Sequence, residues 1–140
     1  MPLGQRALDP KTPYLVYEFS YNGKVFYVGH AHGAIRHTQR WSWVKNLLRH
    51  EDAGTLTPAK AAALKQKSNS VIAALIRSGL SEHKVDVPRR GLGKSWAEVE
   101  ETKRILERVS QGCRLANVAG NPRPASVDEI LCYLGVKNAA

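Results

Sequence analysis

The sequence has few cysteines and no long apolar run, and each of these features argues against some classes of protein. Only Cys113 and Cys132 occur in 140 residues, without the CxxC spacing of a zinc ribbon. We expect neither a structural zinc site nor a disulfide scaffold, and a reducing cytoplasmic setting is the default. The longest apolar run covers residues 71–76, whereas a membrane-spanning helix needs roughly 20 residues. The first residues also lack the apolar stretch of a signal peptide, so no membrane association is expected.

Acidic residues are also in short supply. Aspartate and glutamate number 12 against 21 lysines and arginines, which gives a formal net charge of +9 at pH 7. This balance favours a polyanionic partner such as nucleic acid, although a basic protein without such a partner is the simpler alternative. The length and the 43% apolar composition predict a single domain over residues 1–140.

Two runs of β-forming residues surround an Asn-Gly pair near the N-terminus. Residues 14–19 read YLVYEF and residues 25–28 read VFYV, with Asn22 and Gly23 between them. Both residues of this pair tolerate the positive φ of a tight hairpin turn. We therefore predict an antiparallel hairpin that ends at Gly29 and is followed by a loop.

Helical patterns follow the hairpin. Apolar residues spaced by three and four predict a helix from residue 35 to about 49. Thr57 has the character of an N-cap, with Pro58 at the first helical position, and opens a helical stretch that extends to residue 76. This stretch lies in a helical insert around residues 50–83.

The second half of the chain predicts a strand and a long helix. The alternating residues 83–87 (HKVDV) predict a third strand that stops at Pro88. Ser95 is a good N-cap for a helix that ends near Gly112, and one stripe of this helix is expected to face the sheet. The stripe comprises Val99, Thr102, Leu106 and Val109.

A short extended segment at residues 115–118 and a last helix at residues 127–134 complete the pattern, the latter in a helical tail of residues 122–140. The order of elements predicts an α+β fold. We expect a small three-stranded antiparallel sheet flanked by helices.

Residues 91–95 (GLGKS) end like the phosphate-binding loop of nucleotide-binding proteins. That motif requires a glycine where this chain has Pro88, which also lacks the N–H that a phosphate cradle uses. No nucleotide cofactor is expected. His30 and His32, two residues apart, have no acidic residue or cysteine nearby to complete a zinc site.

Tyr17 and Tyr27 fall on the two hairpin strands and are expected to share one face of the sheet. Half-buried packing residues with solvated hydroxyls are the simpler interpretation of such tyrosines. The sequence around them, Leu15-Val16-Tyr17 and then Tyr27-Val28-Gly29 with an arginine soon after, resembles the signature of the GIY-YIG nuclease family. Residues 97–105 (AEVEETKRI) and 115–118 (LANV) resemble that family's later motifs, and the resemblance covers residues 14–121.

Phosphodiester hydrolysis needs a base for water, positive charge for the developing oxyanions and usually a divalent metal. The resemblance implies tyrosines near the attacking water, an arginine on the scissile phosphate and a glutamate on one metal ion. We assign these roles to Tyr17 and Tyr27, to Arg36 and to Glu101. The metal is expected to be Mg²⁺, or another divalent cation such as Mn²⁺.

Several neighbouring residues are candidates for supporting roles. Arg40 is one helical turn beyond Arg36 and is expected to be a second phosphate contact, with His37 beside it. His30 directly follows the Tyr-Val-Gly motif, where an imidazole that titrates near neutral pH suits proton transfer. Asn117 either orients a catalytic group or binds backbone, and an ordinary turn residue is the alternative.

The helical wheel distinguishes three glutamates. Glu101 projects at the edge of the apolar stripe, Glu100 points away, and Glu98 falls in the first turn, where it complements the helix dipole. Glu101 is therefore the preferred metal ligand and Glu98 the reserve.

The expected function is a metal-dependent endonuclease that acts on DNA, with branched or structured DNA among the candidate substrates. Basic stretches at residues 45–49, 60–67 and 84–94 would contact phosphates, or would be solvated helix faces. Two alternatives stay open. One is a non-catalytic nucleic-acid-binding module on the same scaffold, and the other is a nuclease subunit whose specificity comes from a partner.

Overall fold

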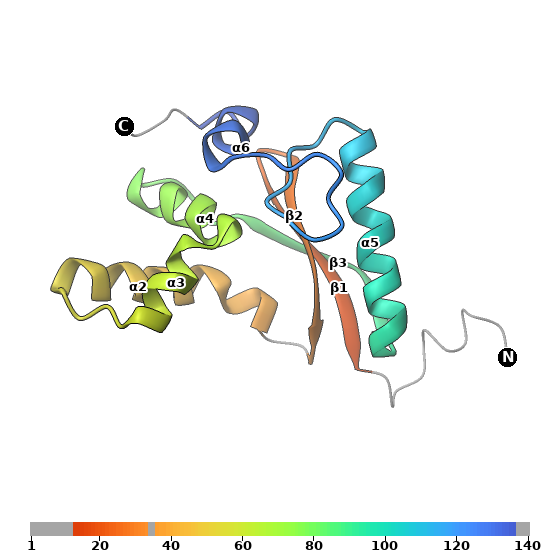
Figure 1. Cartoon of the computed structure of the whole chain (residues 1–140), viewed down its shortest axis with the longest axis horizontal. Helices are drawn as coiled ribbons and strands as arrows, with labels where there is room; N and C mark the ends of the chain where they lie inside the picture. Colours follow the sequence, from red (N-terminus) through yellow and green to blue (C-terminus); the bar gives the residue numbers. More distant parts are fainter. Residues whose placement is uncertain (1–12, 34–35, 137–140) are drawn as a thin grey trace, which may run out of the picture.

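A computed structural model describes residues 13–33 and 36–136. It confirms the predicted α+β fold: three antiparallel strands in the order β2-β1-β3, with helices on both faces of the sheet (Figure 1). The elements are β1 (Tyr14–Tyr21), β2 (Lys24–His32), η1 (Arg36–Gln39), α2 (Arg40–Ala53), α3 (Pro58–Lys65), α4 (Lys67–Arg77), β3 (Lys84–Leu92), α5 (Lys94–Ser110) and α6 (Val127–Tyr133).

The Asn-Gly turn forms the predicted hairpin. Asn22 and Gly23 have φ values of 53° and 74°, the left-handed conformation that a primed turn requires. The predicted end of the second strand at Gly29 is wrong, because β2 continues to His32, which pairs with Tyr14. His30 therefore lies within a strand, opposite Val16, and its position is fixed by the sheet.

The third strand also extends further than predicted. β3 passes through Pro88 to Leu92, and the register between β1 and β3 shifts on both sides of Val16. Proline is tolerated there because β3 is an outer strand and its pairing with β1 is already interrupted by these irregularities.

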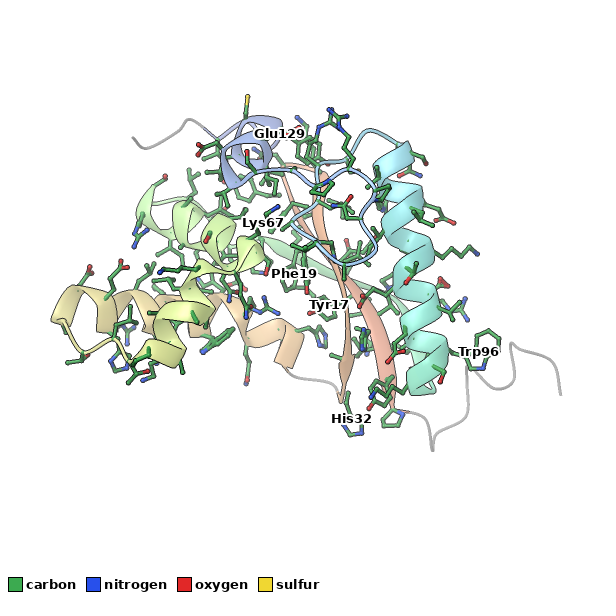
Figure 2. All side chains as sticks on the ribbon, viewed as in Figure 1. Tyr17, Phe19, His32, Lys67, Trp96 and Glu129 are labelled. Carbon is green, nitrogen blue, oxygen red and sulfur yellow. The ribbon has the colours of Figure 1, made fainter. Side chains whose placement is uncertain are left out.

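Alternation along β1 divides the core between the two faces of the sheet. Leu15, Tyr17 and Phe19 join the larger core with residues of α2, α4 and α6. Val16 on the opposite face joins a smaller core beneath α5, with Val28, Ala97 and Ile105. Figure 2 shows Tyr17 and Phe19 in the interior beside the helical layer, and His32 at the end of β2.

A buried ion pair joins β1 to the C-terminal part of α5. Glu18, only 3% exposed, accepts hydrogen bonds from Nε and Nη2 of Arg108, both at 2.8 Å. The carboxylate raises the pKa of Arg108 against the opposing effect of burial. A bidentate pair of this kind ties the C-terminal part of α5 to β1.

The helical insert is broken into two helices. The Thr57 side chain accepts a hydrogen bond from the Lys60 N–H and caps α3, with Pro58 at its first position, as predicted. The predicted continuous helix to residue 76 is wrong, because Gln66 has an extended backbone (φ −61°, ψ 136°) that ends α3 and opens α4. The break turns the start of α4 toward α2, where its polar residues contact Arg40.

The orientation of α5 differs most from the prediction. The helix starts two residues early, with Gly93 in place of Ser95 as its N-cap. Val99 and Leu106, expected to face the sheet, are 58% and 48% exposed. Three residues spaced by four, Ala97, Glu101 and Ile105, face the sheet instead: Ala97 and Ile105 are buried there and Glu101 contacts β2.

The glutamates of α5 are distributed accordingly. Glu100, expected to point away, is 12% exposed in its side chain and pairs with Arg89 of β3 and Arg104 of its own helix. Glu98 is exposed. None of the helices in residues 13–33 and 36–136 is long and apolar enough to cross a bilayer.

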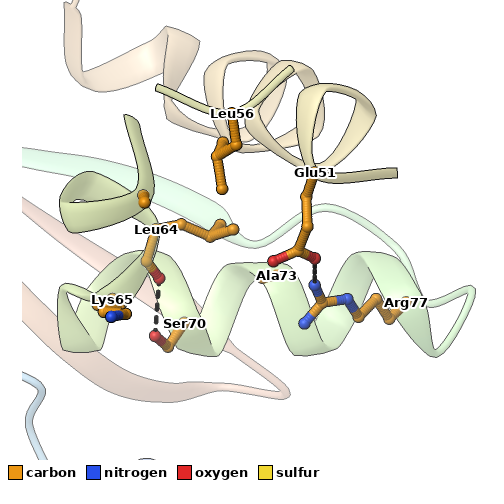
Figure 3. A pocket seen from close by; sticks show the side chains of 8 residues that line it. Glu51, Leu56, Leu64, Lys65, Ser70, Ala73 and Arg77 are labelled. Carbon is orange, nitrogen blue, oxygen red and sulfur yellow. Dashed lines mark hydrogen bonds and ion pairs between the residues drawn. The ribbon is translucent and has the colours of Figure 1, made fainter. Parts of the chain in front are cut away.

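A cavity of about 230 Å³ lies among α2, α3 and α4 (Figure 3). Leu56 and Leu64 supply apolar walls, and Ser70 donates a hydrogen bond to the Leu64 carbonyl. At its rim, Arg77 donates to Glu51, so these two charges neutralise each other. Lys65 also lines the cavity, which therefore combines apolar walls with charged side chains.

Candidate functional site

The larger cleft, about 860 Å³, lies where β1 and the end of β2 meet the starts of α2 and α5. None of the described residues that line it is acidic, whereas Arg40 and Lys94 both face it. The cleft is therefore a positively charged cavity in a chain of net charge +9. Its lining comprises Tyr14, Tyr17, His30, Ala31, His32, His37, Gln39, Arg40, Trp43, Gln66 and Lys94.

Tyr17 lies at the inner end of the cleft. It is only 4% exposed and pairs across the sheet with Gly29, whose missing side chain makes room for the phenol ring. Burial raises the pKa of Tyr17 well above its ordinary value; neighbouring Tyr27 adds to the shift and Arg40 opposes it. The Tyr17 hydroxyl is therefore protonated at neutral pH and is available as a hydrogen-bond donor.

Arg40 is held beside Tyr17 by residues of the helical insert. Its Nη1 donates to Ser68 Oγ at 3.2 Å and to Asn69 Oδ1 at 3.0 Å, and its Nη2 donates to the Tyr17 hydroxyl at 3.5 Å. Asn69 is fully buried, and its Nδ2 donates to the Ala63 carbonyl at 2.8 Å, which fixes the orientation of its amide. Arg40 makes no ion pair with a carboxylate of the described residues.

Aromatic rings surround the same guanidinium. Arg40 Cζ lies 5.5 Å from the ring centre of Phe19 and 5.8 Å from those of Tyr27 and Trp43. Such rings stabilise a cation without neutralising its formal charge. Arg40 is therefore a fixed positive charge at the wall of the cleft, available to an anion.

His30 and Glu101 form the other side of the site. His30 Nδ1 lies 2.5 Å from Glu101 Oε2, and the two side chains are 30% and 24% exposed. In the neutral ring that donates from Nδ1 to the carboxylate, Nε2 keeps its lone pair, which can accept a proton. Glu101 is close enough to Tyr17 for its charge to raise the pKa of that phenol, so both halves of the site act on one another.

His37 covers the ring of Tyr17. The two rings stack with centres 5.4 Å apart, and His37 is 3% exposed with no partner for its buried Nδ1 among the described residues. Burial lowers the pKa of His37, and Arg90 adds to the effect. The imidazole is therefore neutral at pH 7 and helps to hold the Tyr17 ring in place.

Asn117 binds backbone, on the opposite edge of β2 from β1. Its Oδ1 accepts from the Val28 N–H at 3.0 Å and its Nδ2 donates to the Val28 carbonyl at 2.6 Å. The Ala116 N–H donates to the Phe26 carbonyl at 2.7 Å. Asn121, also buried, donates to the Asn117 carbonyl at 2.8 Å. Asn117 therefore fixes the strand that carries Tyr27 and His30 and does not line the cleft.

The structure brings together most of the residues selected from the sequence. Six lie at or beside the cleft: Tyr17, Tyr27, His30, His37, Arg40 and Glu101. Arg36, the preferred phosphate ligand, begins η1, but its side chain lies outside the described part of the chain. Of the two arginines, Arg40 is therefore the one whose side-chain contacts the structure describes.

Several residues of the site were not selected from the sequence: Ser68 and Asn69 bind Arg40, and Trp43 lines the cleft. The local sequence pattern could not identify Ser68 and Asn69 as site residues, because their contacts with Arg40 span 28 and 29 positions of the sequence. Lys94, which also lines the cleft, belongs to the basic stretch 84–94 that the sequence predicts to contact phosphates.

Glu101 could supply one carboxylate ligand to a metal ion whose other ligands are oxygen atoms from outside the protein. The described residues contain no cluster of three or more His, Cys, Asp or Glu side chains placed to hold a metal. Glu101 uses Oε2 toward His30, which leaves Oε1 as the carboxylate oxygen that could ligate a metal. One carboxylate with water and substrate phosphate oxygens is a usual environment for Mg²⁺.

Comparison of the chain with models of known protein families, with characterised proteins and with solved structures finds no match.

Proposed function

We propose that the protein is an endonuclease that hydrolyses phosphodiester bonds in DNA with the help of a divalent metal ion, Mg²⁺ or Mn²⁺. One observation carries the proposal. Tyr17, Arg40 and His30 line a single cleft whose described lining has no acidic residue, and Glu101, outside that lining, contacts His30. An anion-binding group, a proton acceptor and a hydrogen-bond donor in one positively charged cleft suit attack on a phosphodiester.

Arg40 binds the scissile phosphate in this proposal. Its guanidinium carries positive charge that no described carboxylate neutralises, and Ser68 and Asn69 hold it in place before substrate arrives. Preorganised charge of this kind stabilises the transition state without the cost of reorganisation. Lys94 at the start of α5 provides a second cation for the same polyanion.

His30 accepts the proton of the attacking water. Glu101 fixes the ring and stabilises the imidazolium that forms, while His30 Nε2 is the basic atom available to water. The Tyr17 hydroxyl keeps its own proton because burial raises its pKa. It therefore donates a hydrogen bond, which orients the water or a phosphate oxygen.

Glu101 would hold the metal through its second carboxylate oxygen. When bound there, a divalent cation supplies charge stabilisation for the phosphate and the leaving oxygen. Glu101 thus serves the histidine and the metal with different oxygen atoms, and loss of its charge affects both.

The proposal is tested by incubation of the protein with supercoiled plasmid and with branched DNA, in Mg²⁺ or in chelator. We expect nicking in Mg²⁺ alone. Glu101→Ala and Arg40→Ala should each lower the nicking rate by at least about 100-fold. Val118→Ala, at a residue 67% exposed, is the matched control and should nick normally.

Two results would contradict the proposal. Wild-type protein that binds DNA but never nicks it would favour the non-catalytic binding module. Undiminished nicking by Glu101→Ala would refute the role of Glu101 toward both His30 and the metal.

A further inference from the structure

Trp43 is an exposed aromatic residue in the wall of the cleft. It is 43% exposed, although an indole ring normally buries most of its surface. It lies three positions after Arg40 in α2, so the two side chains occupy neighbouring places on one helix face. The Arg40 guanidinium is 5.8 Å from the indole centre.

The cleft that Trp43 lines has groups that suit a nucleobase. Gln39 and Gln66, whose amides can donate and accept hydrogen bonds, line the same cleft. Phosphate and base belong to one nucleotide, so a ring beside the phosphate-binding arginine is within reach of the base attached to that phosphate. Stacking on an aromatic side chain contributes to single-strand binding and accepts any base, because every base has a π face.

We infer that Trp43 stacks on an unpaired base, and that the cleft therefore takes DNA whose nucleotides next to the scissile phosphate are single-stranded. The inference rests on the proposed function for the identity of the polymer. In a duplex, neighbouring base pairs cover the faces of each base, so this contact requires an unpaired or displaced nucleotide. Single strands, flaps and junctions meet that requirement, whereas continuous duplex does not.

The test is fluorescence anisotropy of a labelled oligothymidylate and of a blunt duplex of equal length, in chelator so that no cleavage occurs. We expect wild-type protein to bind the single strand more tightly. Trp43→Ala should weaken single-strand binding by about tenfold or more and change duplex binding by less than about twofold. Trp43→Phe, which keeps a flat ring, should retain most of the affinity.

An abasic strand of the same length separates stacking from phosphate binding. Wild type and Trp43→Ala should bind it equally, because it offers no base to stack. Leu106→Ala is the control for loss of an exposed apolar side chain, since Leu106 is 48% exposed on α5, and it should bind all three ligands like wild type. The ratio between wild type and Trp43→Ala should persist at higher salt, where phosphate contacts weaken.

Equal weakening of single-strand and duplex binding by Trp43→Ala, or no weakening, would overturn the inference. Because the assay needs no turnover, its result is separate from that of the nicking test. A protein that fails to nick DNA but shows Trp43-dependent strand binding contradicts only the proposed hydrolysis. A protein that nicks DNA while Trp43→Ala binds single strands normally contradicts only the role of Trp43.

Discussion

The phenol of Tyr17 lies across the backbone of Gly29. A Cβ atom at position 29 would be 2.5 Å from both Cζ and the hydroxyl oxygen of Tyr17, and 2.9 Å from Cε2 of Tyr27. Both distances are shorter than Cβ contacts in real proteins, so any side chain at this position displaces the ring. The glycine of the Tyr-Val-Gly sequence is therefore part of the site.

Gly29→Ala should lower the nicking rate by about 100-fold, because displacement of a catalytic group by roughly 1 Å has an effect of that size. It should also destabilise the fold by about 1–3 kcal/mol through overpacking. Urea denaturation and plasmid nicking measure the two effects. Gly54→Ala is the control. A Cβ atom at position 54 would have no neighbour within 4 Å, but the φ of +71° is strained for alanine, so this variant should be less stable and should nick at the normal rate. Normal nicking by Gly29→Ala would show that the position of Tyr17 does not matter.

Asn69→Leu should act through Arg40. The change removes the Oδ1 acceptor of Arg40 and the amide bound to the Ala63 carbonyl, which should lower the nicking rate about tenfold and the stability by about 1–3 kcal/mol. The two substitutions should not be additive: Asn69→Leu combined with Arg40→Ala should nick no more slowly than Arg40→Ala alone. Additive losses would mean that Asn69 acts independently of Arg40. Asn46→Ala, exposed on α2, is the control.

Asn117→Ala should destabilise the protein by about 2–4 kcal/mol, since it leaves the buried N–H and carbonyl of Val28 without their partner. Asn117→Asp keeps the acceptor but places a buried carboxylate oxygen against the Val28 carbonyl, so it should destabilise the protein at least as much as Asn117→Ala. Thermal unfolding measures the losses, with Val118→Ala as the neighbouring exposed control. If Asn117→Ala unfolds like wild type, the stability of the protein does not depend on the hydrogen bonds between Asn117 and the Val28 backbone.

The burial of His83 predicts that the protein becomes less stable as the pH falls. It is 4% exposed against Phe19 and Trp41, neither ring nitrogen has a partner among the described residues, and its pKa is lowered to about 4, mainly by burial and secondly by Arg40. The unfolded chain protonates this group near pH 6.5, before the folded chain does. Protonation of His83 therefore leaves the free energy of unfolding unchanged above about pH 6.5. As the pH falls from 6.5 toward 4, the unfolded chain takes up the proton first, and the free energy of unfolding falls by up to about 3 kcal/mol.

Urea denaturation at several pH values tests this prediction. His83→Leu should reduce the loss of stability between pH 6.5 and 4, and at pH 7 it should be as stable as wild type or more stable, because it removes two unpaired buried nitrogens. His50→Gln is the control, since the His50 ring already has polar partners in Thr55 and Lys60. An unchanged pH profile in His83→Leu would place the acid sensitivity elsewhere.

Local chemistry in the sequence was enough to predict the hairpin, the Thr57 cap and the α+β class, because turns and caps depend on residues close together in the chain. The path of β3 through Pro88 could not be predicted, since it depends on register irregularities with β1. The break at Gln66 likewise follows from the backbone of one residue between two good helical patterns.

The candidate site was predicted less evenly. The structure places Tyr17 in the cleft and Tyr27 and Glu101 beside it, so their assigned roles stay predictions, whereas the expected orientation of α5 behind the choice of Glu101 was wrong. Apolar periodicity placed Val99 and Leu106 toward the sheet, whereas the helix directs Glu101 inward and leaves those two residues exposed. Periodicity fails here because the inward face carries a charged residue between Ala97 and Ile105.

The two outer edges of the sheet are both protected against the addition of another strand. Asn117 and Ala116 occupy backbone groups of β2. On the other side β3 carries Lys84, Asp86, Pro88 and two arginines, and charged residues and proline on an edge strand oppose edge-to-edge aggregation. A chain rich in β-forming residues at its N-terminal hairpin therefore offers a second copy few strand edges on which to add a strand.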